Sequence, residues 1–287
     1  MKRLMPVSEE IIIYILFIFI FLLGLTFGSF LNVVALRTLE GKSIVYPSSH
    51  CPVCGTRLKP AELIPIASYI LQKGRCRTCG APISLLYPFG ELLTGFYFVV
   101  WFYPLFKMWR GENELQLFGR SLFGSVGTTQ YLLSGLFLIA LVVVITIADI
   151  RAMIIPDRIL WLAVPFMLAL VIWIDGYTLL MHFLGSLLYG GVFLLTYWVS
   201  RDKMGLGDVK YAFILGFWLG PRLFLFFLLI ASFSALVFAL GRSLIDRHAL
   251  REPLPFGPFM GATAVLLTLF GEALWQWYLQ LFIGNWG

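Results

Sequence analysis

The chain has few charged residues: Asp, Glu, Lys and Arg make up 13% of its 287 residues, and hydrophobic residues make up 60%. A soluble domain needs a polar surface that this composition cannot supply, so a soluble globular protein is excluded. The mean hydropathy of +0.90 indicates a polytopic membrane protein instead. The sequence also contains no internal repeat and no low-complexity stretch.

A continuous basic stripe of the kind that binds nucleic acid is missing, although the pI is about 9.2. The 21 Lys and Arg residues lie in short loops between apolar segments, which indicates membrane topology and no nucleic-acid partner. If the amino terminus is outside, fifteen of them fall in inner loops. The other six are Lys2, Arg3, Lys107, Arg110, Arg120 and Arg222. The positive-inside rule therefore places residues 38–87 on the cytoplasmic side.

Eight apolar segments predict an all-α fold with about eight transmembrane helices, near residues 11–36, 89–106, 131–149, 159–174, 178–199, 209–220, 222–241 and 256–283. The first segment is too long for a signal peptide and lacks a small-residue cleavage site, so we expect it to be retained. The segment 209–220 is too short to cross comfortably alone. Only Gly220-Pro221-Arg222 separates it from the next segment, so one long broken helix is an alternative.

Only four cysteines are present, and all lie between the first two apolar segments, at Cys51, Cys54, Cys76 and Cys79. In each pair two residues intervene and a glycine follows, giving a tight turn that can point both sulfurs at one ion. Four thiolates complete a closed tetrahedral site, which predicts a structural Zn²⁺. Two disulfides or a redox pair are the alternatives, but disulfides would require this basic loop to lie outside. His50 could replace one ligand, although a solvated flanking histidine is favoured.

These features predict three functional regions. Residues 1–37 form the first transmembrane helix, 38–87 a small zinc-bound cytoplasmic insert, and 88–287 a membrane-embedded catalytic domain.

Two aspartates stand in apolar surroundings: Asp149 closes the run 131–149, and Asp208 lies in MGLGDVK, residues 204–210. A carboxylate at the centre of a transmembrane helix costs roughly 2.5–3.5 kcal/mol, so such residues usually have a function. Two carboxyls that share one proton supply both an acid and a base for peptide hydrolysis. The alternatives are an interfacial Asp149 paired with Arg151, and an Asp208 that only caps a helix.

Three neighbours are expected to support Asp208. Gly205 and Gly207 would allow positive φ and a close approach of the backbone. Lys210 and the positive end of the helix dipole would stabilise the charged carboxylate. Farther along, Pro255-Phe256-Gly257-Pro258 predicts an irregular helix start whose free backbone groups need a partner in the protein or a cavity. Glu91, beside the cysteine loop, is a candidate binding residue.

Several motifs in order resemble the type IV prepilin peptidases, intramembrane aspartic proteases with a Gly-x-Gly-Asp motif. They are GSFLNVVALR (28–37), CPVC, CRTC, ISLLYPFGELLTG (83–95), ADIRAMIIPD (148–157), MGLGDVK and PFGPFM (255–260). The resemblance implies that Asp149 and Asp208 are catalytic. It also implies that a multi-pass protein of the bacterial inner membrane cleaves the short basic leader of prepilins or pseudopilins at the cytoplasmic face.

The cysteine loop is characteristic of family members with a second activity. The resemblance therefore implies N-methylation of the new amino terminus with S-adenosylmethionine, and Glu91 is a candidate contact for this reaction. The loop lacks a glycine-rich nucleotide fingerprint, so the methyl-donor site cannot be placed from residues alone. The motifs do not indicate whether pili, type II secretion or DNA uptake is served.

Two functions of other classes compete with this interpretation. One is a proton- or cation-coupled transporter with a zinc-stabilised cytoplasmic loop, in which the aspartates relay ions. Such a transporter would be expected to show internal pseudo-repeats, which this sequence lacks. The other is a membrane scaffold, which leaves the paired aspartates unexplained.

Overall fold

The computed structural model describes residues 7–109, 128–175, 179–200, 204–245, 253–282 and 284. The chain forms two compact units, Met1–Leu115 and Gln116–Gly287. The first unit contains the first predicted helix, the cysteine insert and the second predicted helix. The three-part functional division stays a prediction. Eight basic residues of the topology argument lie outside the described residues, namely Lys2, Arg3, Arg110, Arg120, Arg201, Lys203, Arg247 and Arg251.

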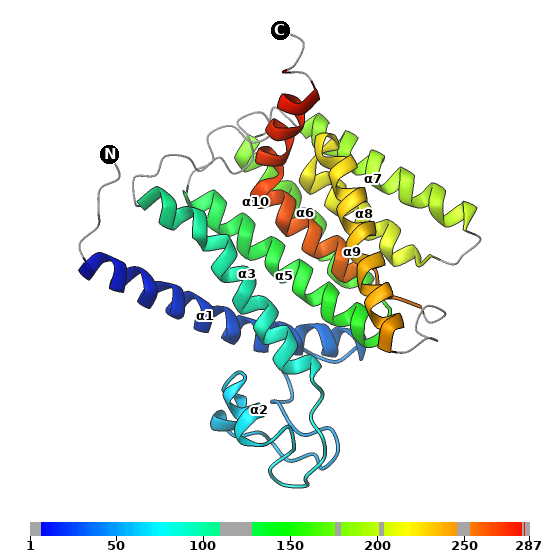
Figure 1. Ribbon diagram of the computed structural model, residues 1–287. Helices are drawn as coiled ribbons and strands as arrows, with labels where there is room; N and C mark the ends of the chain where they lie inside the picture. The colour runs from blue at the N-terminus through cyan, green and yellow to red at the C-terminus, as the bar shows by residue number, and fades with distance from the viewer. Residues whose placement is uncertain are drawn as a thin grey trace. The chain divides into compact units, whose positions relative to one another are not determined.

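The first unit is built on two long antiparallel helices, α1 (Val7–Leu39) and α3 (Leu86–Trp109) (Figure 1). Between them lie a 3₁₀ turn η1 (Pro60–Leu63) and the short helix α2 (Ala67–Leu71). The helices pack closely where both have glycine, since a Cβ added at Gly24 would lie 2.7 Å from the Cα of Gly95. Small residues at such contacts let helices in lipid gain van der Waals packing.

The second unit consists of helices α5 (Thr128–Ala152), α6 (Asp157–Asp175), α7 (Leu179–Val199), α8 (Leu206–Leu219), α9 (Phe224–Ile245) and α10 (Gly257–Phe282) (Figure 1). The short helix α8 packs against α6, α7 and α10, and most of its side chains are buried. It therefore lies inside the helical unit, which explains how so short a segment can be almost entirely apolar after Lys210.

All eight predicted helices are found, and the all-α fold is confirmed. Apart from two isolated β-bridges in the insert, the regular elements of the described part of the chain are helical. Six described segments are long and apolar enough to cross a membrane: Ile11–Leu39, Leu86–Phe106, Thr129–Ala152, Leu179–Val199, Pro221–Ile245 and Gly257–Phe282. Helices α6 and α8 are not among them, so the predicted count of eight spans is approximate.

The structure resolves the question of one broken helix or two. Helix α8 ends at Leu219, and Gly220 follows with φ 71°, a conformation that glycine adopts without strain. A 3₁₀ turn η3 (Pro221–Leu223) then leads into α9. The two segments are separate helices, because Gly220 ends the first and Pro221 begins a new turn.

Candidate metal centre and active site

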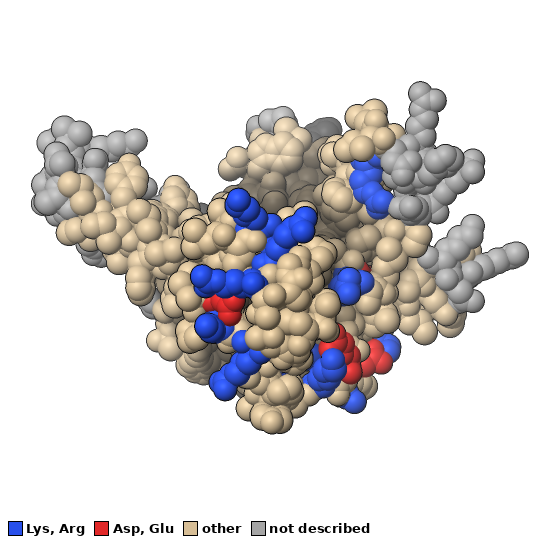
Figure 2. Space-filling model, turned by 90° about the horizontal axis from the view of Figure 1, so that it is seen from below, with Lys and Arg blue, Asp and Glu red and all other residues tan. Residues whose placement is uncertain are grey.

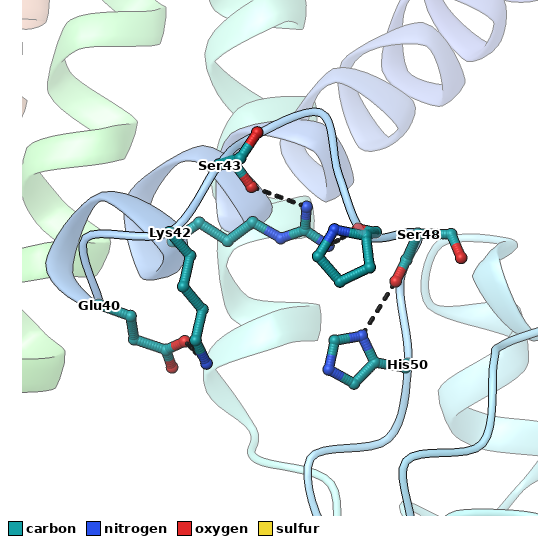
Figure 3. Close-up of polar contacts among 7 residues, drawn as sticks. Glu40, Lys42, Ser43, Ser48 and His50 are labelled. Atoms are coloured by element: carbon teal, nitrogen blue, oxygen red, sulfur yellow. Dashed lines mark hydrogen bonds and ion pairs between the residues drawn. The ribbon is translucent and has the colours of Figure 1, made fainter.

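The cysteine insert begins with a loop that one arginine holds against the end of α1 (Figure 3). Arg37, in the last turn of α1, donates from Nη1 to the carbonyls of Ser43 (3.0 Å) and Ile44 (3.2 Å). Its Nη2 donates to the carbonyl of Pro47 at 2.6 Å. The guanidinium therefore satisfies three backbone acceptors of a loop that forms no regular secondary structure.

Each Cys-x-x-Cys pair forms a tight turn with the same backbone hydrogen bonds. The first cysteine of the pair accepts from the glycine that follows the second, at 2.9 Å in both turns. Its own N–H donates to the carbonyl of Thr56 (3.0 Å) in the first turn and of Ala81 (2.8 Å) in the second. The glycines, Gly55 and Gly80, have φ 70° and 72°, so the predicted glycine turns are confirmed.

The two turns bring Cys51, Cys54, Cys76 and Cys79 together, with all four sulfur atoms within 4.8 Å of one another. The sulfurs of Cys51 and Cys79 are 3.8 Å apart. A tetrahedral ion with metal–sulfur bonds of about 2.3 Å separates its sulfurs by about 3.8 Å. All four cysteines are free thiols, so the disulfide alternative is not found. The four thiols could therefore bind one metal ion.

His50 does not join the four sulfurs. It is exposed, and its Nδ1 lies 3.0 Å from the carbonyl oxygen of Ser48 (Figure 3). The interpretation of this residue as a solvated neighbour agrees with its position.

The thiols of the cluster differ in acidity. Hydrogen bonds from the side chain and the backbone of Thr56 lower the pKa of Cys54 to about 6, and backbone N–H groups of Cys79 and Thr78 lower the pKa of Cys76. At Cys79 a backbone hydrogen bond at Ala81 lowers the pKa, but desolvation and the neighbouring sulfurs outweigh it and raise the value to about 11. Thiolates this close repel one another, and a bound cation would remove that repulsion.

The surface of the insert is basic. Exposed Lys and Arg side chains gather in the middle of the face in Figure 2, which is viewed from below. In the insert these are Lys42, Arg57, Lys59, Lys73, Arg75 and Arg77. Such a bias is typical of loops on the cytoplasmic side of a membrane.

Glu91 links the insert to α3. Its carboxylate is buried, with 7% of the residue exposed, and Oε2 accepts a hydrogen bond from the backbone N–H of Ile66 at 2.8 Å. Ile66 directly precedes α2 and has φ 61°, which is unfavourable for a β-branched residue. Ser29 of α1 also hydrogen-bonds to the Glu91 side chain. The carboxylate thus fixes the start of α2 on the paired helices α1 and α3.

Asp149 lies near the end of α5 and is buried, with 5% of the residue exposed. Its Oδ2 accepts a hydrogen bond from the backbone N–H of Gly257 at 2.8 Å. Gly257 is the first residue of α10, so this N–H has no acceptor within its own helix. The irregular helix start predicted at residues 255–258 is confirmed, and its free N–H is bound by Asp149.

Asp208 lies in the first turn of α8 and is half-buried. Its carboxyl interacts electrostatically with that of Asp149, so the fold brings the two predicted aspartates into one site. The helix that ends near Asp149 and the helix that begins near Asp208 belong to the same compact unit.

The two glycines before Asp208 act differently from the prediction. Gly205 is the N-cap of α8 with φ −72°, and Gly207 lies within the helix, so the predicted positive φ is wrong. The predicted close approach is found at Gly207, where an added Cβ would lie 3.0 Å from the Cβ of Ile155. Glycine at this position lets α8 start against the segment that joins α5 to α6.

Lys210 forms an ion pair with Asp157, in contrast to the expected pairing with Asp208. Its Nζ lies 2.7 Å and 2.8 Å from the two carboxylate oxygens of Asp157, the first residue of α6. Both side chains are about half exposed, so water screens the pair strongly. The ion pair ties α6 to α8 near Asp208.

Comparisons with known proteins show the family of the chain. Residues 22–105 match the family model described as the bacterial peptidase A24 N-terminal domain. Residues 136–240 match that of the type IV leader peptidase family. A protein of Bacillus subtilis (strain 168) is 32% identical over 272 residues, which cover 92% of this chain and 98% of that protein. The chain belongs to the type IV leader peptidase family.

Other relatives in this family have the same description as the Bacillus protein, "Prepilin leader peptidase/N-methyltransferase". A protein of Aeromonas salmonicida (strain A449) is 30% identical, with 93% of this chain and 95% of that protein covered. One of Dickeya chrysanthemi is 31% identical, with 87% and 92% covered. No solved structure matches the chain.

Sequence reasoning missed two contacts of the candidate site. One is the hydrogen bond from the N–H of Gly257 to Asp149. The sequence indicated only the irregular helix start at residues 255–258 and not its partner. The other is the ion pair of Lys210 with Asp157, which lies 53 residues away in the sequence.

Proposed function

We propose that the chain is a leader peptidase and N-methyltransferase whose peptidase chemistry is carried out by Asp149 and Asp208. The observation that carries this assignment is the buried Asp149 carboxylate, held by the Gly257 N–H, with Asp208 as its electrostatic neighbour. Both residues lie in helices of the unit that matches the peptidase family model. The family and the names of the relatives support hydrolysis and give no support to the transporter alternative.

The two carboxyls supply the proton transfers that peptide hydrolysis needs. The ionised carboxylate takes a proton from water while the water oxygen bonds to the scissile carbonyl carbon, and the protonated carboxyl gives its proton to the carbonyl oxygen. When the tetrahedral intermediate collapses, the C–N bond breaks, the leaving nitrogen takes a proton from the pair, and one hydroxyl of the intermediate returns its proton to the pair as the C=O bond forms again. The products are a carboxylic acid on the leader and a free amine on the mature chain.

The proposed substrates are prepilins or pseudopilins in the bacterial inner membrane. The names of the relatives support prepilins as this substrate class, and the apolar spans of the chain support a membrane protein that meets the apolar segment of such a substrate in the bilayer. The basic surface of the insert supports a cytoplasmic position for the insert.

The second proposed activity is N-methylation of the new amino terminus, with S-adenosylmethionine as the co-substrate. The amine nitrogen would attack the sulfonium methyl group, the carbon–sulfur bond would break with its electron pair on sulfur, and the nitrogen would lose a proton to a base. The four-cysteine cluster would hold a structural Zn²⁺ that folds the insert, because four thiolates leave no coordination position open. Glu91 would position the insert for this reaction through Ile66.

Replacement of each aspartate tests the peptidase assignment. We expect Asp149→Asn and Asp208→Asn each to reduce cleavage of a prepilin by roughly 10²-fold or more, because an amide can neither accept nor donate the required proton. The measurement is leader removal in membranes, with immunoblots to show that each variant is inserted. Cleavage that persists in both inserted variants would refute the assignment.

A further inference from the structure

Thr146 has a buried hydroxyl for which the described part of the chain provides no hydrogen-bond partner. The residue is 2% exposed and lies in α5, and its Oγ1 is unpaired among the described residues. Four other helical threonines donate to the carbonyl four residues earlier, namely Thr38, Thr94, Thr196 and Thr268. Thr146 does not make this hydrogen bond to its own helix, and a buried hydroxyl without a partner is unfavourable.

The position of Thr146 on α5 places it beside the aspartate site. It lies one helical turn before Asp149 and one turn after Val142, so the three residues share a face of α5. Both ends of this stripe meet α10. Asp149 binds the N–H of Gly257, and a Cβ added at Gly261 would lie 2.7 Å from Cγ1 of Val142.

Helix α8, which carries Asp208, also has a residue close to this part of α5 and α10. Tyr211 lies one turn after Asp208 in α8, and a Cβ added at Gly261 would lie 3.0 Å from the Tyr211 hydroxyl. The α5 face that carries Thr146 therefore lies where α5, α8 and α10 converge. This region is next to the two carboxyls, because Thr146 is one turn from Asp149 in α5 and Tyr211 is one turn from Asp208 in α8. The Thr146 hydroxyl can take part in the reaction only through a polar partner in this region.

We propose that the Thr146 hydroxyl binds the attacking water of the peptidase reaction beside Asp149. This inference rests on the proposed peptidase function. One hydrogen of the water bonds to the Asp149 carboxylate, the other bonds to Oγ1 of Thr146, and a lone pair of the water oxygen faces the scissile carbonyl carbon. Since the Gly257 N–H occupies Oδ2 of Asp149, Oδ1 is left for the water. Thr146 keeps its own proton throughout, so the atoms and charges of the hydrolysis are unchanged.

The test compares Thr146→Val, which removes the hydroxyl at nearly constant volume, with Thr146→Ser, which retains it. We expect Thr146→Val to lower kcat for leader removal by ~10-fold, because the attacking water loses one of the two hydrogen bonds that orient it. KM should change by less than ~2-fold, because the peptide contacts are untouched. Thr146→Ser should keep kcat within ~3-fold of the wild type.

Ser134→Ala is the matched control. Ser134 is buried in the same helix, but its Oγ already donates to the carbonyl of Tyr131 at 2.8 Å, so its loss should leave kcat unchanged. If Thr146→Val does not accumulate in the membrane, Thr146→Ala takes its place, because it removes the hydroxyl without adding volume.

Two outcomes overturn the inference. One is a valine or alanine variant with wild-type kcat, and the other is a serine variant as impaired as the valine variant. Asp149→Asn in the same assay separates this inference from the function on which it rests. Cleavage by Asp149→Asn refutes the peptidase assignment, whereas an inactive Asp149→Asn beside a fully active Thr146→Val refutes only the role of Thr146.

Discussion

Asp149 is held in place by a glycine from another helix. The N–H of Gly257 donates to Oδ2 of Asp149, and the same oxygen lies 2.8 Å from the position of a Cβ added at Gly257. The site thus needs residue 257 for its N–H and for its lack of a side chain. Pro258 follows directly and provides no N–H of its own, so the donor at Gly257 has no equivalent one residue later.

We expect Gly257→Ala to reduce leader cleavage by roughly 10²-fold or more, because the new methyl group displaces the carboxyl from its donor. The measurement is the rate of prepilin processing by the purified variant in detergent or nanodiscs. Gly241→Ala is the matched control, since a Cβ at Gly241 in α9 meets no atom within 4 Å. Equal activity of the two alanine variants would contradict this account of Asp149.

At the scale of the helix, the position of α8 depends on its packing against neighbouring helices. It has 14 residues, and it packs against α7 where glycines of both helices meet. A Cβ added at Gly216 would lie 2.5 Å from the carbonyl oxygen of Gly185 and 2.7 Å from Cβ of Tyr189. The backbone atoms at this contact cannot move aside, so the helix that carries Asp208 depends on small residues for its position.

Gly216→Ala should therefore lower the free energy of unfolding by ~1–3 kcal/mol, the usual cost of overpacking a filled interface. Thermal unfolding in detergent checks this expectation. The reference variant is Gly191→Ala in α7, where an added Cβ meets open space and no comparable loss is expected. An unchanged unfolding temperature for Gly216→Ala would show that α7 and α8 are not packed this closely.

At the scale of the whole molecule, the residues proposed for the two activities lie in different compact units. The cysteine cluster and Glu91 lie in Met1–Leu115, and both aspartates lie in Gln116–Gly287. A metal that only folds the insert should therefore be dispensable for the packing of the second unit.

We expect Cys51→Ser with Cys76→Ser to abolish zinc binding and N-methylation while leader cleavage continues. Glu91→Ala should also reduce methylation selectively, because it releases the start of α2. Elemental analysis gives the zinc content, and mass spectrometry of the processed substrate reports both cleavage and methylation. A double cysteine variant that lost cleavage and methylation in equal measure would count against this division.

The elements that depend on local pattern were predictable from the sequence. Apolar runs gave the eight helices, and the segment 131–149 differs from α5 (Thr128–Ala152) by three residues at each end. Each Cys-x-x-Cys-Gly pattern gave a turn with positive φ at its glycine. These features follow from the hydrophobicity, the spacing and the φ freedom of residues that are neighbours in the chain.

The contacts of the site were less predictable, because they join residues far apart in the sequence. Lys210 stands two positions after Asp208, yet its ammonium pairs with Asp157, since successive residues of a helix point in different directions. The N–H of Gly257 reaches Asp149 across 108 residues. The φ of Gly205 also could not be read from its residue type, because glycine adopts helical and extended conformations as readily as left-handed ones.

Arg37 has a structural role besides its contribution to the charge bias of the loops. It is one of the basic residues on which the predicted topology rests, and its guanidinium also binds three carbonyls of the first insert loop. Lysine would keep the charge and lose this planar, multi-donor geometry. A lysine at position 37 would therefore leave the first insert loop without this link to α1, so the loop that leads to the cysteine module depends on arginine chemistry as well as on charge.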